Sequence, residues 1–308
     1  MRTKRFLPFA VAALALGVAA PAMAIVRRHD RPASQITALG ALSQFQAVGQ
    51  LNMPGALCSG TLISNTWVLT AAHCVDGGMP ASSFRIGGIT YTAAESIIHP
   101  NWTGDLANGF DIALVRLTTT VTGITPAILN TSFAEVGKTA TYVGFGNTGD
   151  GVTGFVNGTT GIKRAGRNVI DGLGSVFGGV SSSILLSDFD SPDGTKNAFA
   201  AIGSSATALD DEASIAPGDS GGGMFTEVSP GQWRLTGVHS FIGAFGAPNG
   251  DGVPNAQYGE YMGSTRVSDY TSWINGHVFA SAPEPTSMAL FGLGLGAVAV
   301  RLRRRRAH

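Results

Sequence analysis

Short runs of apolar and β-branched residues recur along the middle of the chain and predict an all-β domain. Gly, Asn, Asp and Pro separate these runs, and such residues favour turns over continued strand. Many short strands with frequent turns are typical of β-barrels or sandwiches. Residues 144–179 are instead rich in glycine and polar groups, so surface loops with one strand near Ile162–Asn168 are expected there. The predicted strands are Phe45–Gly49, Ser59–Ile63, Trp67–Thr70, Tyr91–Ile98, Ile112–Leu117, Thr139–Phe145, Ile184–Leu186, Gly222–Glu227 and Trp233–Phe241.

Helical spacing occurs in one stretch near the end of the chain. Val267, Tyr270 and Trp273 recur every three residues and are followed directly by Ile274. Apolar residues at this spacing line one face of an α-helix. The pattern predicts a helix over Ser264–His277, and no other helix is expected before it.

The first 24 residues have the pattern of a secretory signal peptide. Arg2 and Arg5 lie in a basic start, Phe6–Ala20 is apolar, and Ala22-Met23-Ala24 forms a small-x-small cleavage site. Cleavage after Ala24 would release an exported protein. A retained membrane anchor is the alternative, but the apolar run is short.

The last 26 residues form a second targeting segment. Pro283-Glu284-Pro285 precedes an apolar stretch, Thr286–Val300, and five arginines follow within the last eight residues. At a rise of ~1.5 Å per residue this stretch covers ~22 Å, short of a ~30 Å hydrocarbon core, and the arginines would stay cytoplasmic. The arrangement resembles the PEP-CTERM sorting signal. The resemblance implies that residues 283–308 anchor the chain transiently in the inner membrane until a transpeptidase-like enzyme cuts them; an uncleaved anchor is the alternative.

Charge and composition exclude several classes of protein. The chain has 20 basic and 20 acidic residues, but eight of the basic residues and only one acidic residue lie in the two ends, so residues 25–282 are acidic. A nucleic-acid binder needs a basic face, and this domain lacks the charge for one. Charged residues make up 13% of the chain and there are 43 glycines, which disfavours both disorder by charge and long helices.

Two cysteines are present, Cys58 and Cys74. In an exported protein they are expected to form a disulfide. A zinc site would need further thiols or histidines at ligand spacing, and the sequence does not offer them. We expect no metal and no cofactor; the acidic segment Asp188–Gly194 departs from a calcium loop and is interpreted as a polar turn.

Three separate motifs suggest nucleophilic catalysis. Ser220 lies in Gly218–Gly222, where neighbouring glycines allow a substrate carbonyl to approach the backbone. A serine hydroxyl attacks only if a base removes its proton. His73 follows a predicted strand, and Asp111 stands at the start of another, so a base and an acid to orient it are available. Each motif alone is weak evidence.

Together, these segments resemble the trypsin/chymotrypsin family of serine proteases. The order histidine, aspartate, serine differs from the order serine, acid, histidine of α/β-hydrolases, which disfavours an esterase using His239 or His277. The matching segments occur in the family's order over residues 57–274: Leu57–Ile63, Trp67–Cys74, Asp111–Leu117, Gly218–Gly222 and Thr265–Ile274.

The resemblance implies a fold of two six-stranded antiparallel β-barrels followed by a C-terminal helix. It implies that Ser220 is the nucleophile, His73 the general base and Asp111 the residue that orients the histidine. The backbone N–H groups of Gly218 and Ser220 would form the oxyanion hole. An exported serine endopeptidase with a polypeptide substrate, spanning residues 25–282, is therefore predicted, and a catalytically silent surface binding module is the alternative.

The same resemblance implies a substrate pocket. Ser214 stands at the pocket base, where an aspartate would select Lys or Arg, and Ser240-Phe241 match the strand that pairs with substrate backbone. Ile242 matches a wall position, where a branched side chain favours small apolar residues. Gly223 and Ala216 depart from the family pattern.

An activation pair is also implied. In the family, the carboxylate before the nucleophile, here Asp219, pairs with a newly formed N-terminal amine. Ile25 would supply that amine directly after signal peptidase cleavage. Arg27-Arg28 replace the usual glycine pair, so a later cleavage at one of these arginines is the alternative.

Overall fold

The computed structural model describes residues 24–77, 81–246 and 251–279. The predicted signal peptide before Ala24 and the predicted sorting segment, residues 283–308, lie outside these ranges. No helix within the described ranges is long and apolar enough to cross a membrane. The predicted membrane segment Thr286–Val300 lies outside them.

The first half of the domain is a closed, antiparallel, six-stranded barrel, as expected. Its strands follow the order β2-β3-β4-β7-β6-β5 around the barrel, so closure leaves no open sheet edge. Leu62, Val68 and Phe84 are fully buried inside it. The strands are β2 (Val48–Met53), β3 (Ala56–Ser64), β4 (Trp67–Thr70), β5 (Ser83–Ile86), β6 (Ile89–Ile98) and β7 (Ala113–Leu117).

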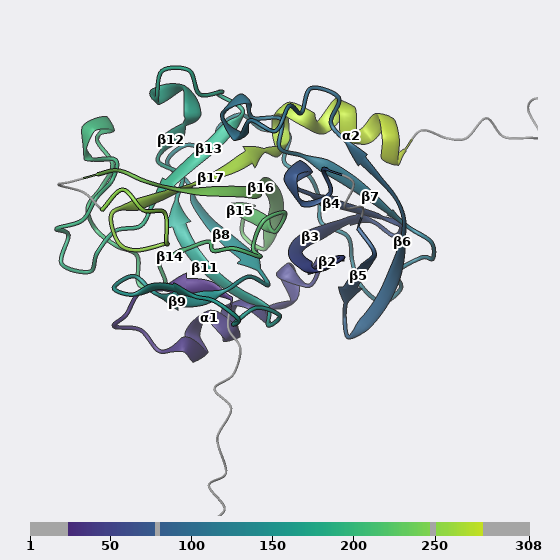
Figure 1. Ribbon diagram of the computed structural model, residues 1–308, viewed down its shortest axis with the longest axis horizontal. Helices are drawn as coiled ribbons and strands as arrows, with labels where there is room; N and C mark the ends of the chain where they lie inside the picture. The colour runs from purple at the N-terminus through teal and green to yellow at the C-terminus, as the bar shows by residue number, and fades with distance from the viewer. Residues whose placement is uncertain (1–23, 78–80, 247–250, 280–308) are drawn as a thin grey trace, which may run out of the picture.

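The second half is also built of strands, but it is more complex than the six-stranded barrel expected. A seven-stranded sheet has the order β11-β8-β15-β16-β17-β13-β12, and a four-stranded sheet has the order β10-β9-β1-β14. Figure 1 shows these strands beside the first barrel. The bounds are β1 (Ile25–Arg27), β8 (Thr139–Gly144), β9 (Thr148–Asp150), β10 (Gly154–Val156), β11 (Arg164–Val169), β12 (Gly172–Leu173), β13 (Ile184–Asp188), β14 (Ala213–Ser214), β15 (Gly223–Ser229), β16 (Gln232–Ala244) and β17 (Glu260–Arg266).

Strand β1 lies inside the four-stranded sheet, although the sequence pattern did not predict it. It pairs in parallel with β9 and antiparallel with β14. Ile25 and Val26 are fully buried. The start of the domain is therefore a structural part of its second half.

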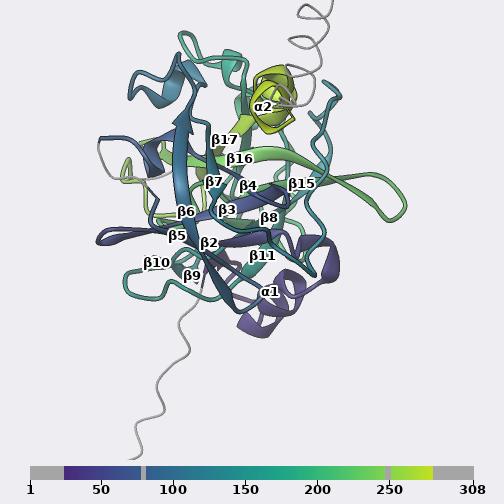
Figure 2. The same ribbon diagram turned by 90° about the vertical axis from the view of Figure 1, so that its right-hand side faces the viewer.

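The helices differ from the expected single helix. Helix α2 (Thr271–Val278) confirms the later part of the predicted helix, but residues up to Arg266 belong to β17, which pairs with β13 and β16, and η6 (Val267–Tyr270) follows. Helix α1 (Ala33–Gly40) was not predicted; it lies at the opposite end of the molecule from α2 (Figure 2). The remaining helical turns are η1 (Ser43–Phe45), η2 (Ala72–Cys74), η3 (Leu106–Asn108), η4 (Gly174–Val176) and η5 (Ala200–Ile202).

The glycine-rich region 144–179 contains more strand than expected. β11 confirms the strand predicted near Ile162–Asn168, whereas β9, β10 and β12 were missed because each has only two or three residues. Such strands exist only because neighbouring strands hold them, so local sequence carries little signal for them.

A group of acidic side chains comes together from the end of β13, from the two ends of the segment between β13 and β14, and from Asp171. Asp188, Asp190 and Glu212 are buried, and Asp171 is partly buried beside them. Burial, the largest cause, and mutual repulsion raise the pKa of Asp171 to about 7 and of Asp190 to about 9; burial raises that of Glu212 to about 8. By contrast, Asp193 is exposed and accepts hydrogen bonds within a turn, which lower its pKa to about 2.

The free energy of unfolding is expected to fall as the pH rises from about 5 to about 9. The folded chain retains protons on Asp171, Asp190 and Glu212 that the unfolded chain releases near pH ~4, so the stability present at acid pH is lost through this window. Urea unfolding at about pH 5, 7 and 9 measures the effect. Asp190→Asn should flatten the fall and Asp193→Asn should not; a wild-type stability that climbs steadily with pH contradicts this prediction.

Candidate active site

His73 lies in a short turn that follows the end of β4. The turn η2 positions it, and the Cys58–Cys74 disulfide, which confirms the expected bridge, ties this turn to β3. The His73 side chain is 33% exposed, so one edge of the ring reaches solvent. The disulfide therefore holds a partly exposed histidine side chain at the edge of the first barrel.

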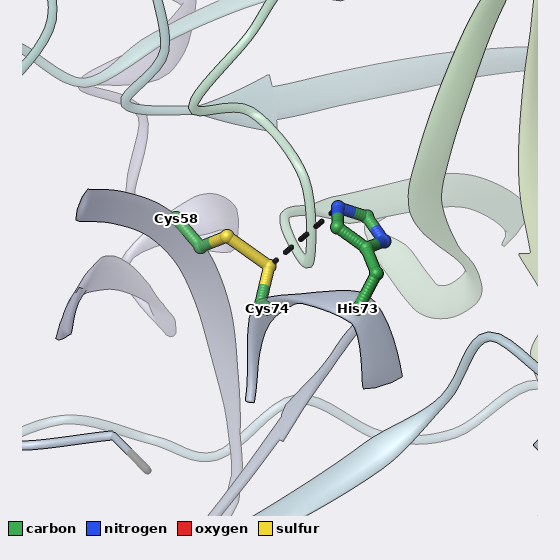
Figure 3. Close-up of side chains that lie close together, drawn as sticks. All are labelled: Cys58, His73 and Cys74. Carbon is green, nitrogen blue, oxygen red and sulfur yellow. Dashed lines mark hydrogen bonds between the residues drawn. A yellow bond between two sulfur atoms is a disulfide. The ribbon is translucent and has the colours of Figure 1, made fainter. Parts of the chain in front are cut away.

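Figure 3 shows the imidazole of His73 beside this disulfide, with Nε2 3.9 Å from Sγ of Cys74. These three residues are the only grouping of His, Cys, Asp and Glu side chains in the described ranges that has metal-ligand spacing. Both sulfur atoms are committed to the S–S bond and cannot act as thiolate ligands. The proximity therefore reflects packing and not a zinc site.

Asp111 is fully buried just before β7 and fixes the orientation of His73. Its Oδ1 accepts the backbone N–H of His73 at 2.9 Å, and its Oδ2 lies 2.7 Å from His73 Nδ1. Because an ionised carboxylate only accepts hydrogen bonds, Nδ1 carries the hydrogen and Nε2 of the neutral ring keeps its lone pair. Ser240 Oγ donates to the same Oδ2 at 2.5 Å, and Thr265 Oγ1 donates to the Asp111 carbonyl at 2.8 Å.

Ser220 lies in a tight turn that the first barrel holds in place. Ser59 of β3 donates its backbone N–H to the Ser220 carbonyl at 2.8 Å and its Oγ to the Gly218 carbonyl at 2.9 Å. Ser59 Oγ also accepts the N–H of Phe145, next to β8. One residue thus joins the two halves of the domain at the turn that carries Ser220.

Gly221 allows this turn to approach the segment that leads to His73. Its φ is +78°, and a Cβ there would lie 2.1 Å from Thr70 Oγ1 and 2.4 Å from the Ser59 carbonyl oxygen. Thr70 precedes His73 by three residues. The structure therefore brings the Ser220 turn and the His73 turn together across the junction of the two halves.

Asp219 is fully buried next to Ser220, among backbone N–H groups. Its carboxylate accepts from Gly146 at 2.8 Å and from Ala216 at 2.9 Å. A Cβ at Gly144 would lie 2.1 Å from the same carboxylate, so only glycine fits there. Burial raises the pKa of Asp219 to about 7, whereas the N–H groups of Gly146, Ala216 and Ile25 lower it.

Ile25 therefore lies beside Asp219, as the activation pair requires, and its backbone is strained. Its φ is +61°, which is a rare conformation for a β-branched residue. Thr148 Oγ1 donates to its carbonyl at 2.6 Å and holds the strand in register. The strain involves the carbonyl group of Ala24, because that group defines φ at Ile25.

The predicted pocket residues lie on β14 and β16. Ser214 is buried and pairs with Val26 of β1, Ser240 is buried against Asp111, and Phe241 and Ile242 are partly buried along β16. No hydrogen bond links Ser214 to the His73–Asp111 pair among the described contacts. A cleft of about 550 Å³ lies beside Gly218, and the residues that line it include Leu57, Asn147 and Pro217.

Sequence reasoning missed three residues of the site. Ser59 and Thr265 fell within matching segments, but nothing in the sequence indicated that they would hydrogen-bond to the Ser220 turn and to Asp111. Met262 pairs directly with Ile242 across β16 and β17 and is buried. Its strand β17 was not predicted, and the end of that strand was expected to be helical, so the position of Met262 opposite Ile242 emerged from the structure alone.

The two histidines considered for an esterase have other environments. His239 is fully buried, stacks on Tyr142 and accepts the Val143 N–H through Nε2 at 3.2 Å. Burial lowers its pKa to about 3, so it stays neutral. His277 lies on α2, where its Nδ1 donates to the Trp273 carbonyl.

Comparison with known families gives two matches. The Trypsin family model matches residues 37–167, and the PEP-CTERM protein-sorting motif matches residues 281–306. The second match confirms the resemblance of the C-terminal segment to a sorting signal and indicates an exported protein.

Curated relatives and solved structures agree with the first match. Chymotrypsin-like elastase family member 1 of Bos taurus is 32% identical over 238 residues, covering 72% of this chain and 78% of the relative. The Homo sapiens protein of the same name is 33% identical over 236 residues, covering 73% and 81%. The structure of neuropsin, a serine protease of mouse brain, has a TM-score of 0.54 at 21% identity and covers 77% of this chain and 96% of its own, which supports the fold.

Gly221→Ala is expected to destabilise the domain far more than the same change at Gly231. Both glycines have φ near +75°, but a Cβ at Gly231 meets nothing within 4 Å, whereas one at Gly221 collides with Thr70 and Ser59. Gly231→Ala should cost only the left-handed backbone penalty of ~1–2 kcal/mol. Thermal unfolding of both variants measures this; equal losses of stability would show that the two turns are not in tight contact.

Proposed function

We propose that Ser220, His73 and Asp111 carry out peptide hydrolysis in this chain. The chain belongs to the trypsin family of serine proteases and is a serine endopeptidase. In this proposal the Ser220 hydroxyl attacks the peptide carbonyl while Nε2 of His73 takes its proton. The histidine then gives that proton to the leaving amine, and water hydrolyses the acyl-enzyme by the same route.

The hydrogen bonds around Asp111 are the observation that carries this proposal. Asp111 accepts both the backbone N–H and Nδ1 of His73, so the ring has one orientation and one tautomer. That tautomer presents the lone pair of Nε2, which is what a general base needs. The bond from Ser240 adds a further donor to the carboxylate, which helps to hold its orientation.

The backbone N–H groups of Gly218 and Ser220 would bind the oxyanion of the tetrahedral intermediate. Each of these N–H groups shares a peptide plane with the carbonyl of the residue before it. Those carbonyls, of Pro217 and Asp219, accept hydrogen bonds from the N–H groups of Asn147 and Gly222, both at 2.8 Å, which supports this assignment. Gly218 has a φ of +96°, and a Cβ there would lie 2.8 Å from Cα of Gly146. Glycine is therefore needed for the turn to have this shape.

Activation is proposed to follow from removal of the signal peptide. Cleavage after Ala24 would give Ile25 a free amine beside the buried carboxylate of Asp219. The two would form a charge pair, in place of a buried carboxyl group whose pKa is raised to about 7. Cleavage would also relieve the strained φ of Ile25, since no Ala24 carbonyl remains. A later cut after Arg28 is disfavoured, because Arg28 is 7% exposed.

The substrate pocket is proposed to accept small apolar side chains such as Ala or Val. Ser214 offers no charge to a Lys or Arg side chain, which would lose several kcal/mol of hydration without a counter-charge. Ile242 and Met262 face each other across β16 and β17 and would narrow the slot. Relatives named chymotrypsin-like elastases support this preference.

Export, sorting and surface location complete the proposal. Signal peptidase would cut after Ala24, and a transpeptidase-like sorting enzyme would act near Pro283-Glu284-Pro285 within the matched motif. The mature domain would then span residues 25–282, at the cell surface or outside the cell, with a polypeptide substrate and no nucleic acid.

Ser220→Ala and His73→Ala are expected to abolish nearly all peptide hydrolysis, and Asp111→Asn to lower kcat by about 10⁴-fold, because Asn would stabilise the wrong histidine tautomer. Ser43→Ala, at an exposed serine on η1, serves as the matched control and should hydrolyse peptide normally. Peptide cleavage assays and labelling by an organophosphonate measure these effects. Absence of any label on folded wild-type protein contradicts the assignment of Ser220.

Ile242→Gly is expected to widen the pocket and to shift preference from Ala or Val toward Phe or Tyr. Ile128→Gly is the control, since Ile128 is 58% exposed and is not one of the predicted pocket residues. Profiling each protein with a peptide library gives the ratio of kcat/KM for small and aromatic residues. Wild-type preference for Arg or Lys would overturn the assignment of Ser214, and preference for Phe or Tyr that of Ile242.

A further inference from the structure

Arg28 follows β1 directly and is buried, with 7% of its surface exposed. Its Nε and Nη2 donate to the two oxygens of Asp30 at 2.9 and 2.7 Å, which is a bidentate ion pair. Its Nη1 donates to the backbone carbonyl of Leu209 at 2.7 Å and contacts that of Ala208 at 3.4 Å. One guanidinium thus joins the N-terminal segment to a loop about 180 residues away in sequence.

That loop leads directly into β14. Leu209 is also held from the other side, because its N–H donates to Glu212 at 2.6 Å. Ser214 of β14 pairs with Val26 of β1. The loop is therefore joined to the N-terminal segment at two points. Arg28 binds the loop at Leu209, and β14, which follows the loop, pairs with β1.

Strand β1 depends on these two contacts because it has only three residues. A free chain end with so few paired residues frays unless another contact secures it. After cleavage, the amine of Ile25 would begin this strand, only three residues before Arg28. A contact at Arg28 therefore fixes the position of the amine and of Ser214 together.

We propose that Arg28, oriented by Asp30, is a positioning residue that holds the N-terminal amine of Ile25 against Asp219 and the base of the substrate pocket in place. The inference rests on the proposed activation by Ile25 and on the pocket position of Ser214. The family usually has glycine here, which has no side chain to form such a contact.

Arg167 offers a matched control. It forms an ion pair with Asp211 of the same loop at 3.1 Å, but its side chain is 41% exposed. An exposed pair contributes little to stability. Arg167→Ala therefore removes an arginine of β11 that contacts the same loop, without removing a buried clamp.

The experiment compares mature wild-type, Arg28→Ala, Arg28→Lys and Arg167→Ala proteins. N-terminal sequencing first establishes that each begins at Ile25, and thermal unfolding establishes that each is folded. Arg28→Ala should lower kcat/KM by about 10²-fold, and Arg167→Ala should change it little.

The alkaline limb of the pH profile of kcat/KM should move about one pH unit lower in Arg28→Ala, because the loosened amine loses its proton more easily. The acid limb should stay unchanged. Arg28→Lys, which lacks the planar fork, should fall between the two.

A folded Arg28→Ala protein whose kcat/KM and alkaline limb equal those of wild type overturns the clamp. If Arg28→Ala does not fold, the same two readouts on Arg28→Lys decide the matter, and an unchanged profile there overturns it equally. A wild-type protein that is active with another N-terminus, or that is inactive, instead overturns the proposed function. The two failures are therefore distinct.

Discussion

A buried carboxylate, Asp219, is the constraint on which the second half of this domain depends. It is fully enclosed next to Ser220, so its charge must be met by donors within the structure. The N–H groups of Gly146 and Ala216 donate hydrogen bonds to the carboxylate, and Gly144 leaves room for it because glycine has no side chain. The strand that begins at Ile25 is inserted among β9 and β14 so that its first N–H reaches the same carboxylate. The contacts of Asp219 within the second half thus help to fix the turn that carries Ser220.

The first barrel shapes the same turn from the other side. Ser59 donates to the carbonyls of Gly218 and Ser220, and Thr70 lies against Gly221. His73 follows Thr70 in a turn that a disulfide secures, and Asp111 fixes its ring. His73 and Ser220 come from different halves of the chain, so the distance between their side chains depends on how tightly the halves pack.

Sequence alone located β3, β4, β6 and β7 of the first barrel and the motifs that carry His73, Asp111 and Ser220, because each lies in or beside an apolar run. It missed β5 and placed β2 too early in the chain. It did not reveal α1, which has only two large buried side chains, Ile36 and Leu39, and no capping side chain. It extended the last helix too far, because β17 pairs with strands distant in sequence and this pairing outweighs local spacing. The sequence offered Arg28 only as a possible cleavage point, and its burial and its hydrogen bonds to Asp30 and Leu209 emerged from the structure alone.

In the proposed activation, a free amine at Ile25 must neutralise Asp219 before the site can work. The most direct measurement compares kcat/KM of two purified forms of the protein that differ by one residue, one beginning at Ile25 and one beginning at Ala24. The account predicts that the Ile25 form hydrolyses peptides and that the Ala24 form, although folded, is at least about 10²-fold less active, since its oxyanion site loses its support. Equal kcat/KM for the two forms would contradict it.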